Sequence, residues 1–219
     1  MRWKWVGLGL ILLALALVGA AFLPVPLRGL AEASGGEAYW SELLREVEGQ
    51  LKKQPEEREL LFTYAVATAN LGRLDDSVRA FRQLENLTRL PDGGGDPLSA
   101  EVYEAQLAAH PGDLLLLNKL AFLYYAREEY GAASRFFRQA SQLDSSNEWP
   151  RNYLAYCLYR TGDLDGALSA LEEALALNPH NSYTHLLLGL AYAEKGWYLK
   201  SLQELAKGRR ALSHLLSFQ

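Results

Sequence analysis

The chain repeats its own residue pattern with a period of 34 residues, and this repeat constrains the fold more than any other feature. The clearest copies are the consecutive windows 114–147, 148–181 and 182–215. Apolar residues of similar size recur at matching places, as in Leu120-Ala121, Leu154-Ala155 and Leu188-Gly189, and again as Ala140, Ala174 and Gly208. A uniform period over three copies predicts a stack of similar structural units.

Each copy has the pattern of two helices joined by a short polar turn. Its large and small apolar residues recur at spacings of three and four, which places them on one face of a helix. The small residues allow two helix axes to approach closely. Polar turns such as Thr161-Gly162-Asp163-Leu164 separate the helices, and Asn178-Pro179 ends one copy. No segment has a strand pattern, so the predicted fold class is all-α.

These residues resemble the tetratricopeptide repeat (TPR) family. The resemblance is clearest from Tyr153-Leu154-Ala155 through Gly162-Asp163, Ala167, Leu171, Ala174 and Asn178-Pro179. A fourth copy at 58–91 matches at Tyr64-Ala65, Gly72 and Phe81, and departs at Thr68 and Leu84. The resemblance covers roughly 34–215 and implies a solenoid of helical hairpins.

Glycine and proline divide this solenoid into two groups. Residues 91–97 hold three glycines between two prolines, which excludes the interior of a helix. We therefore predict a loop at 92–97 between an N-terminal TPR-like group, 37–91, and a C-terminal TPR array, 98–219. Helices at 37–54 and 98–110 are predicted as partial units in the same frame.

The N-terminal segment is predicted to cross a membrane. Val6–Leu23 contains 18 residues without a charge, long enough as a helix to span roughly 27 Å. Arg2 and Lys4 precede it, so we expect a transmembrane signal-anchor at 1–27, a tether at 28–36, a cytoplasmic N-terminus and an extracytoplasmic (periplasmic-side) repeat body. The alternative is a signal peptide cleaved after Val18-Gly19-Ala20.

Composition excludes several classes of function. The chain has 22 basic and 26 acidic residues, a net charge of −4, so it lacks the positive field of a nucleic-acid-binding protein. Its one cysteine, Cys157, excludes a disulfide framework and a multi-cysteine metal site. The four histidines show no metal-binding pattern, and no glycine-rich phosphate loop follows a strand. We expect no catalytic residues, no metal and no cofactor, and thus a protein that is not an enzyme.

A partner-binding groove is predicted instead. The TPR resemblance implies that the first helix of each hairpin lines a concave face, where TPR proteins usually bind peptides. The side chains placed there are mostly aromatic, and two asparagines suit hydrogen bonds to a partner backbone. The predicted residues are Asn118, Phe122, Tyr125, Trp149, Asn152, Tyr156, Tyr159, Arg160, Tyr183 and Leu186. The alternative is that the aromatic side chains pack between neighbouring helices.

Together these features predict a membrane-tethered scaffold or adaptor that binds a peptide or helix of a protein partner in its groove. The expected setting is the assembly or biogenesis of an envelope protein complex. The alternative is a permanent structural subunit of a larger membrane complex. Leu212, Leu215 and Leu216 form a further apolar stripe at helical spacing, which we expect a partner or a second copy to cover.

Overall fold

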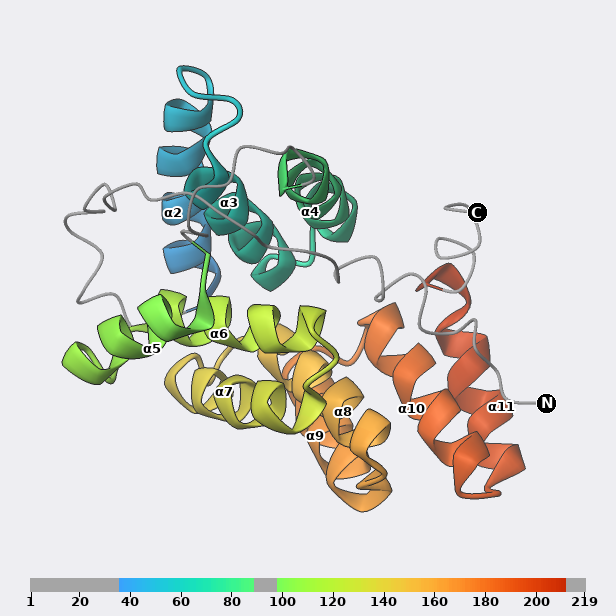
Figure 1. The fold of residues 1–219 in the computed structure, drawn as a ribbon. Helices are drawn as coiled ribbons and strands as arrows, with labels where there is room; N and C mark the ends of the chain where they lie inside the picture. The colour runs from blue at the N-terminus through green and yellow to red at the C-terminus, as the bar shows by residue number, and fades with distance from the viewer. Residues whose placement is uncertain (1–35, 89–97, 212–219) are drawn as a thin grey trace.

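The computed structural model describes residues 36–88 and 98–211 of the chain. The regular elements in these two ranges are all helices, so the expected all-α class is confirmed there (Figure 1). They are α2 (Gly36–Leu51), α3 (Arg58–Asn70), α4 (Leu74–Thr88), α5 (Ala100–Ala109), α6 (Leu114–Ala126), α7 (Tyr130–Leu143), α8 (Trp149–Thr161), α9 (Leu164–Leu177), α10 (Ser182–Glu194) and α11 (Tyr198–Lys207).

The helices pair in the manner of a TPR-like solenoid. The hairpins are α3–α4, α6–α7, α8–α9 and α10–α11, while α2 packs on α3 and α5 packs on α6. Each hairpin of the C-terminal array continues onto the next one, because α7 packs against α8 and α9 packs against α10. The stack buries the apolar residues of most of these helices against a neighbouring helix.

Local signals in the sequence explain where these helices begin and turn. The Asp113 carboxylate accepts a hydrogen bond from the Leu116 amide at 2.9 Å, which caps the start of α6. The same turn position of the three repeats has a positive φ, with values of 59° at Glu128, 88° at Gly162 and 76° at Gly196. Glycine adopts this left-handed conformation without strain, and glutamate does not.

The small residues of the repeat lie where two helices touch. Ala155, Ala167 and Ala174 are buried in the α8–α9 hairpin. The third repeat has glycines at two of these places, and a Cβ added at Gly208 would lie 2.6 Å from the backbone nitrogen of Leu186. The crossing of α10 with the end of α11 therefore has no room for a methyl group.

The N-terminal group packs directly on the C-terminal array. Figure 1 shows α2, α3 and α4 on one side of the row formed by α5 to α9, with α10 and α11 at its far end. Helix α3 contacts both α6 and α8, and residues of the two groups share one hydrophobic core. The C-terminal array therefore packs along the side of α3, so that α3 contacts two of its hairpins.

Several predicted segments lie outside the described residues. These are the anchor at 1–27, almost all of the tether at 28–36, the loop at 92–97 and the stripe of Leu212, Leu215 and Leu216. Within 36–88 and 98–211, no helix combines the length and the apolar character that crossing a membrane requires.

Candidate functional site

Helix α3 lies across α6 and α8, on the face where the sequence predicts the groove. The Tyr153 hydroxyl of α8 donates a hydrogen bond to the Ala69 carbonyl at 3.1 Å. The Asn70 amide donates to Oδ1 of Asn118 on α6 at 3.2 Å, and the Asn147 amide donates to the Asn70 carbonyl at 3.1 Å. All these groups are buried, so this part of the inner face is filled by the chain itself.

Phe122 forms the centre of an aromatic cluster between the two groups. Its ring centroid lies 5.9 Å from that of Phe81 on α4, 5.2 Å from Phe137 and 4.9 Å from Tyr153. Tyr125 continues the cluster along α6, and burial raises the pKa of its hydroxyl well above the usual value. Asn118, Phe122 and Tyr125 are all buried, and the two aromatic rings pack between neighbouring helices.

A partly buried ion pair links α6 to the start of α3. The Lys119 ammonium group contacts the Glu59 carboxylate, which also accepts a hydrogen bond from the Tyr103 hydroxyl of α5. The same ammonium group lies 5.4 Å from the centroid of the Tyr103 ring. This pair fixes the crossing of α3 over α6 at one end, while Asn70 fixes it at the other.

Asn152 joins α8 to α10. It is buried, and its Oδ1 accepts a hydrogen bond from the Thr184 hydroxyl at 2.9 Å. Its side-chain nitrogen is buried without a hydrogen-bond partner among the described residues. In this structure the Asn152 side chain thus joins two helices of the array, which is a different contact from the predicted one to a partner's backbone.

Tyr156 and Arg160 extend the aromatic cluster toward the other end of α8, since the ring centroids of Tyr125 and Tyr156 lie 5.5 Å apart. The Arg160 guanidinium donates to the hydroxyl oxygens of Tyr130 at 2.7 Å and of Tyr156 at 2.8 Å, and it stacks on the Tyr130 ring at 4.3 Å. Burial raises the pKa of both tyrosines, so their hydroxyl groups stay neutral. The Arg160 guanidinium thus binds to tyrosines of its own chain.

Trp149 packs against the turn between α3 and α4. A Cβ added at Gly72 would lie 2.5 Å from the Trp149 ring, and Gly72 also has a positive φ of 68°. On its other side, Trp149 contacts the Tyr183 ring of α10, with centroids 5.9 Å apart. Trp149 therefore forms part of the boundary between the filled inner face and the space beside α10.

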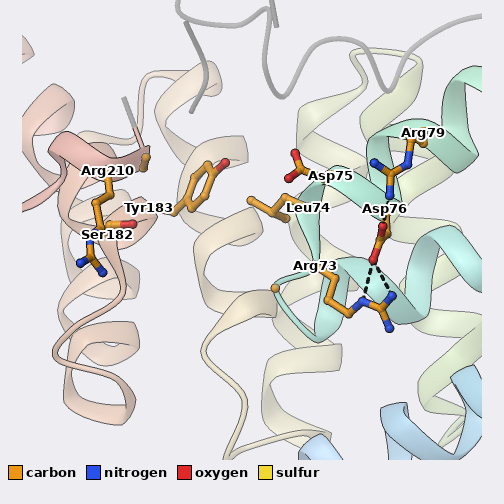
Figure 2. Close-up of a pocket in the computed structure, with 10 residues that line it drawn as sticks. Arg73, Leu74, Asp75, Asp76, Arg79, Ser182, Tyr183 and Arg210 are labelled. Atoms are coloured by element: carbon orange, nitrogen blue, oxygen red, sulfur yellow. Dashed lines mark hydrogen bonds and ion pairs between the residues drawn. The ribbon is translucent and has the colours of Figure 1, made fainter. Parts of the chain in front are cut away.

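That space is a cleft of about 450 Å³ between the α3–α4 turn and the start of α10. Figure 2 shows Tyr183 of one wall facing Leu74 and Asp75 of the other, with Arg73, Asp76 and Arg79 grouped farther from Tyr183. The first wall comes from the α3–α4 turn and the beginning of α4, and the second from α10 and the segment after α11. The lining residues are Gly72, Arg73, Leu74, Asp75, Asp76, Arg79, Ser182, Tyr183, Arg210 and Ala211.

The first wall carries an ordered set of charges. Asp76 accepts a hydrogen bond from Nε of Arg73 at 2.6 Å and also pairs with Arg79. The hydrogen bond to Asp76 raises the pKa of Arg73, which keeps this guanidinium cationic. Burial, and after it the Asp75 carboxylate, raises the pKa of Tyr183 to about 12. The cleft therefore presents charges of both signs beside a neutral tyrosine hydroxyl.

Such a lining can bind a polar segment of a protein by charge-assisted hydrogen bonds to arginine and aspartate. Among the described residues, no group of three His, Cys, Asp or Glu side chains could hold a metal ion. Cys157 is buried, and burial raises its pKa far above the value of a reactive thiol.

The sequence and the structure agree on only one lining residue of this cleft. Of the ten predicted groove residues, Tyr183 lines it and Trp149 borders it. The other eight lie elsewhere. Tyr159 is half-buried, and Arg160 hydrogen-bonds to Tyr130 and Tyr156. The remaining six are buried: Asn118, Phe122, Tyr125, Asn152, Tyr156 and Leu186. The sequence did not indicate Arg73, Asp75, Asp76 and Arg79, because only the packing of α3–α4 against the array brings them opposite Tyr183. Nor did it indicate Arg210, which lies in the same wall as Tyr183.

Comparison with known proteins finds similarity over parts of this chain. Residues 155–196 match the family model described as TPR repeat. Trafficking protein particle complex subunit 12 of Mus musculus is 26% identical over 136 residues, which cover 62% of this chain and 15% of that protein. The general transcriptional corepressor trfA of Dictyostelium discoideum is 28% identical over 98 residues, covering 44% of this chain and 7% of that one. The chain thus spans less than a fifth of the length of these relatives.

Solved structures of MamA are similar in outline. The structure of MamA residues 41 to the end from Desulfovibrio magneticus RS-1 is 16% identical, covers 78% of this chain and 85% of that one, and gives a TM-score of 0.49. The MamA MSR-1 structure is 18% identical, covers 81% and 89% of the two chains, and has the same TM-score of 0.49.

Proposed function

We propose that this chain, which contains tetratricopeptide repeats, is a scaffold that binds a protein partner through the cleft between the α3–α4 turn and α10. We further propose that residues 1–27 anchor it in a membrane, with the N-terminus cytoplasmic and the repeat body extracytoplasmic. In that position it would hold a component of an envelope protein complex during assembly. The proposal assigns no reaction, metal or cofactor to the chain.

The observation that carries the proposal is the cleft itself. TPR-type stacks commonly bind partners on their concave side, and here α3 fills the part of that side formed by α6 and α8. The remaining open part lies beside α10, and its walls contain three arginines, two aspartates and one tyrosine. We therefore move the expected contact from the predicted groove residues of α6 and α8 to this cleft.

The lining favours a partner segment that carries charges of both signs. Arg73 is oriented by Asp76, so little side-chain entropy remains to be lost when a carboxylate of the partner binds to it. Tyr183 offers a rigid ring and a neutral hydroxyl donor, a combination enriched at protein interfaces. Because the cleft is lined from two hairpins, a bound segment would also link the two groups of the chain.

Site-specific photo-cross-linking in native membranes tests this proposal. A benzophenone amino acid at Tyr183 of the full chain should form one discrete protein adduct, and Arg73→Glu should reduce the adduct several-fold. The control is the same amino acid at Tyr124, whose ring stacks on Phe136 outside the cleft lining. Equal adducts at the two positions, or none at 183, would contradict the cleft as the binding site.

The same adduct separates the two kinds of membrane role. A partner held by an exchanging adaptor should be lost when membranes are washed with increasing salt before irradiation, because the contacts in the cleft are charged. A partner bound in a permanent complex should still be cross-linked after the wash.

The topology of the chain is tested separately. A phosphatase fused to the C-terminus should be active, and a mature protein that begins at Ala21 would show that the segment is cleaved and does not anchor the chain.

A further inference from the structure

The turn between α10 and α11 and the first residues of α11 expose large apolar side chains. The exposed fraction is 42% for Trp197, 69% for Tyr198, 81% for Leu199 and 65% for Leu202. We call these four residues the α11 apolar face. Four large exposed apolar side chains thus lie within six positions of the chain, and exposed apolar surface of this kind can mark an interaction site.

Stacking of a further repeat explains only part of this face. Leu202 corresponds to Leu168 of the preceding repeat, which is buried in a hairpin that α10 covers. Trp197 and Leu199 correspond to Asp163 and Asp165, which are both exposed. The third repeat therefore has apolar side chains at two positions where the preceding repeat has solvated carboxylates. A further repeat stacked on α11 would not cover these two positions.

The charge of this hairpin is also opposite in sign to that of the preceding hairpin. Residues 195–210 contain five basic residues and one acidic residue, whereas the corresponding segment 161–176 contains four acidic residues and no basic one. The one acid, Glu204, is turned inward and pairs with His185. The end of the array is thus cationic in a chain whose net charge is −4.

The cations border the aromatic rings directly. The Lys195 ammonium group lies 4.8 Å from the centroid of the Trp197 ring, and that of Lys200 lies 4.6 Å from it. Lys195 also pairs with Asp165, and Lys200 lies 5.4 Å from the Tyr192 ring. Lysines around Trp and Tyr match the boundary between hydrocarbon and headgroups, where aromatic rings collect and lysine stems extend toward phosphate.

We propose that the α11 apolar face lies on an anionic lipid bilayer, with its apolar side chains below the headgroups and Lys200 among the phosphates. A surface contact of this kind combines apolar burial with attraction between basic residues and anionic lipid. A second copy of the chain fits less well, because a two-fold contact through this face would bring like charges together. The contact is separate from any membrane span and from the cleft, since none of its four residues lines the cleft.

A spin label at position 199 of the full chain tests the proposal. Leu199→Cys is labelled and reconstituted in vesicles of phosphatidylcholine with or without phosphatidylglycerol, and accessibility to oxygen is compared with accessibility to an aqueous nickel complex. Cys157 is buried, so the wild-type chain serves as the unlabelled blank. The matched control is Ser169→Cys, an exposed position on α9 of the preceding repeat.

We expect the label at 199 to be immersed in the anionic vesicles, and the label at 169 to remain aqueous in both kinds. Adding Lys200→Gln should lower the ratio of immersed to aqueous signal by about fivefold, as expected for one basic residue near a charged surface. An aqueous label at 199 in both kinds of vesicle would overturn the proposal. So would a label at 199 that is shielded from both reagents and cross-links to a protein, since this would show a protein contact.

Discussion

Replacement of Gly208 by alanine tests how closely α10 approaches the end of α11. The two preceding repeats carry Ala140 and Ala174 at the same position. Alanine is the better helix former by about 1 kcal/mol, so a comparison of the repeats alone would predict a more stable protein. The structure predicts the opposite.

The magnitude follows from the atoms that the new methyl group would meet. A Cβ at position 208 would lie 2.6 Å from the backbone nitrogen of Leu186 and 2.8 Å from its Cα. These are backbone atoms of α10, so the clash is relieved only by moving the helix. Overpacking of this kind costs about 1–3 kcal/mol. Gly208 follows the last residue of α11, so the propensity gain is only partial, and we expect a net loss of about 1–2 kcal/mol.

Thermal melting and amide hydrogen exchange measure this loss. The melting midpoint should fall by about 2–8 °C, and exchange should accelerate in α10 and α11 before it does so elsewhere. The control is Gly131→Ala in α7, where no atom lies within 4 Å of the added Cβ and the better propensity should raise stability. If Gly208→Ala melts at or above the wild-type temperature, α10 and α11 are not in the contact described.

Three further substitutions test other parts of the fold. Glu128→Gly should raise the free energy of unfolding by about 0.5–1 kcal/mol, because Glu128 adopts a φ of 59° that glycine adopts without strain; an unchanged melting temperature would argue against that turn. Ala155→Leu should lower it by about 1–3 kcal/mol by overpacking the α8–α9 contact, and a melting point within a degree of wild type would show a wrong helix register. Glu204→Gln should destabilise α10–α11 by about 0.5–1 kcal/mol at pH 7, seen by chemical denaturation. Burial raises the pKa of Glu204, but hydrogen bonds from Lys207 and His185 outweigh this effect and lower the pKa from 4.5. The difference between wild type and variant should therefore begin to shrink near pH 4.5 and disappear once the pH is below the lowered pKa. A difference that persists when the carboxylate is fully protonated would exclude the carboxylate as its cause.

The local architecture was predictable because it depends on residues close in sequence. The period of 34 residues, the small residues such as Ala155 and Ala174, and the turn at Gly162 each report the packing of one helix on its neighbour. Even so, the sequence does not show that Glu128 takes the conformation of Gly162 and Gly196, because glutamate is unfavourable there.

The candidate site was not predictable in the same way. The periodicity places Phe122 and Asn152 on the inner face, but it cannot show that α3 and Thr184 occupy that face. Arg73 and Tyr183 are more than a hundred positions apart, and no pattern of spacing relates them. Their approach depends on the angle at which the N-terminal group packs, and contacts such as that of Lys119 with Glu59 determine this angle.

The crossing of α3 over α6 and α8 changes how the array should unfold. In an ordinary solenoid each repeat contacts only its neighbours, so an end can open while the rest stays folded. Here hydrogen bonds between residues 77 and 84 positions apart join the end of α3 to the start of α8. The N-terminal end and the middle of the array should therefore lose their structure in one cooperative step. The α10–α11 hairpin has its main contacts only with α8 and α9, so it is the end that can open alone.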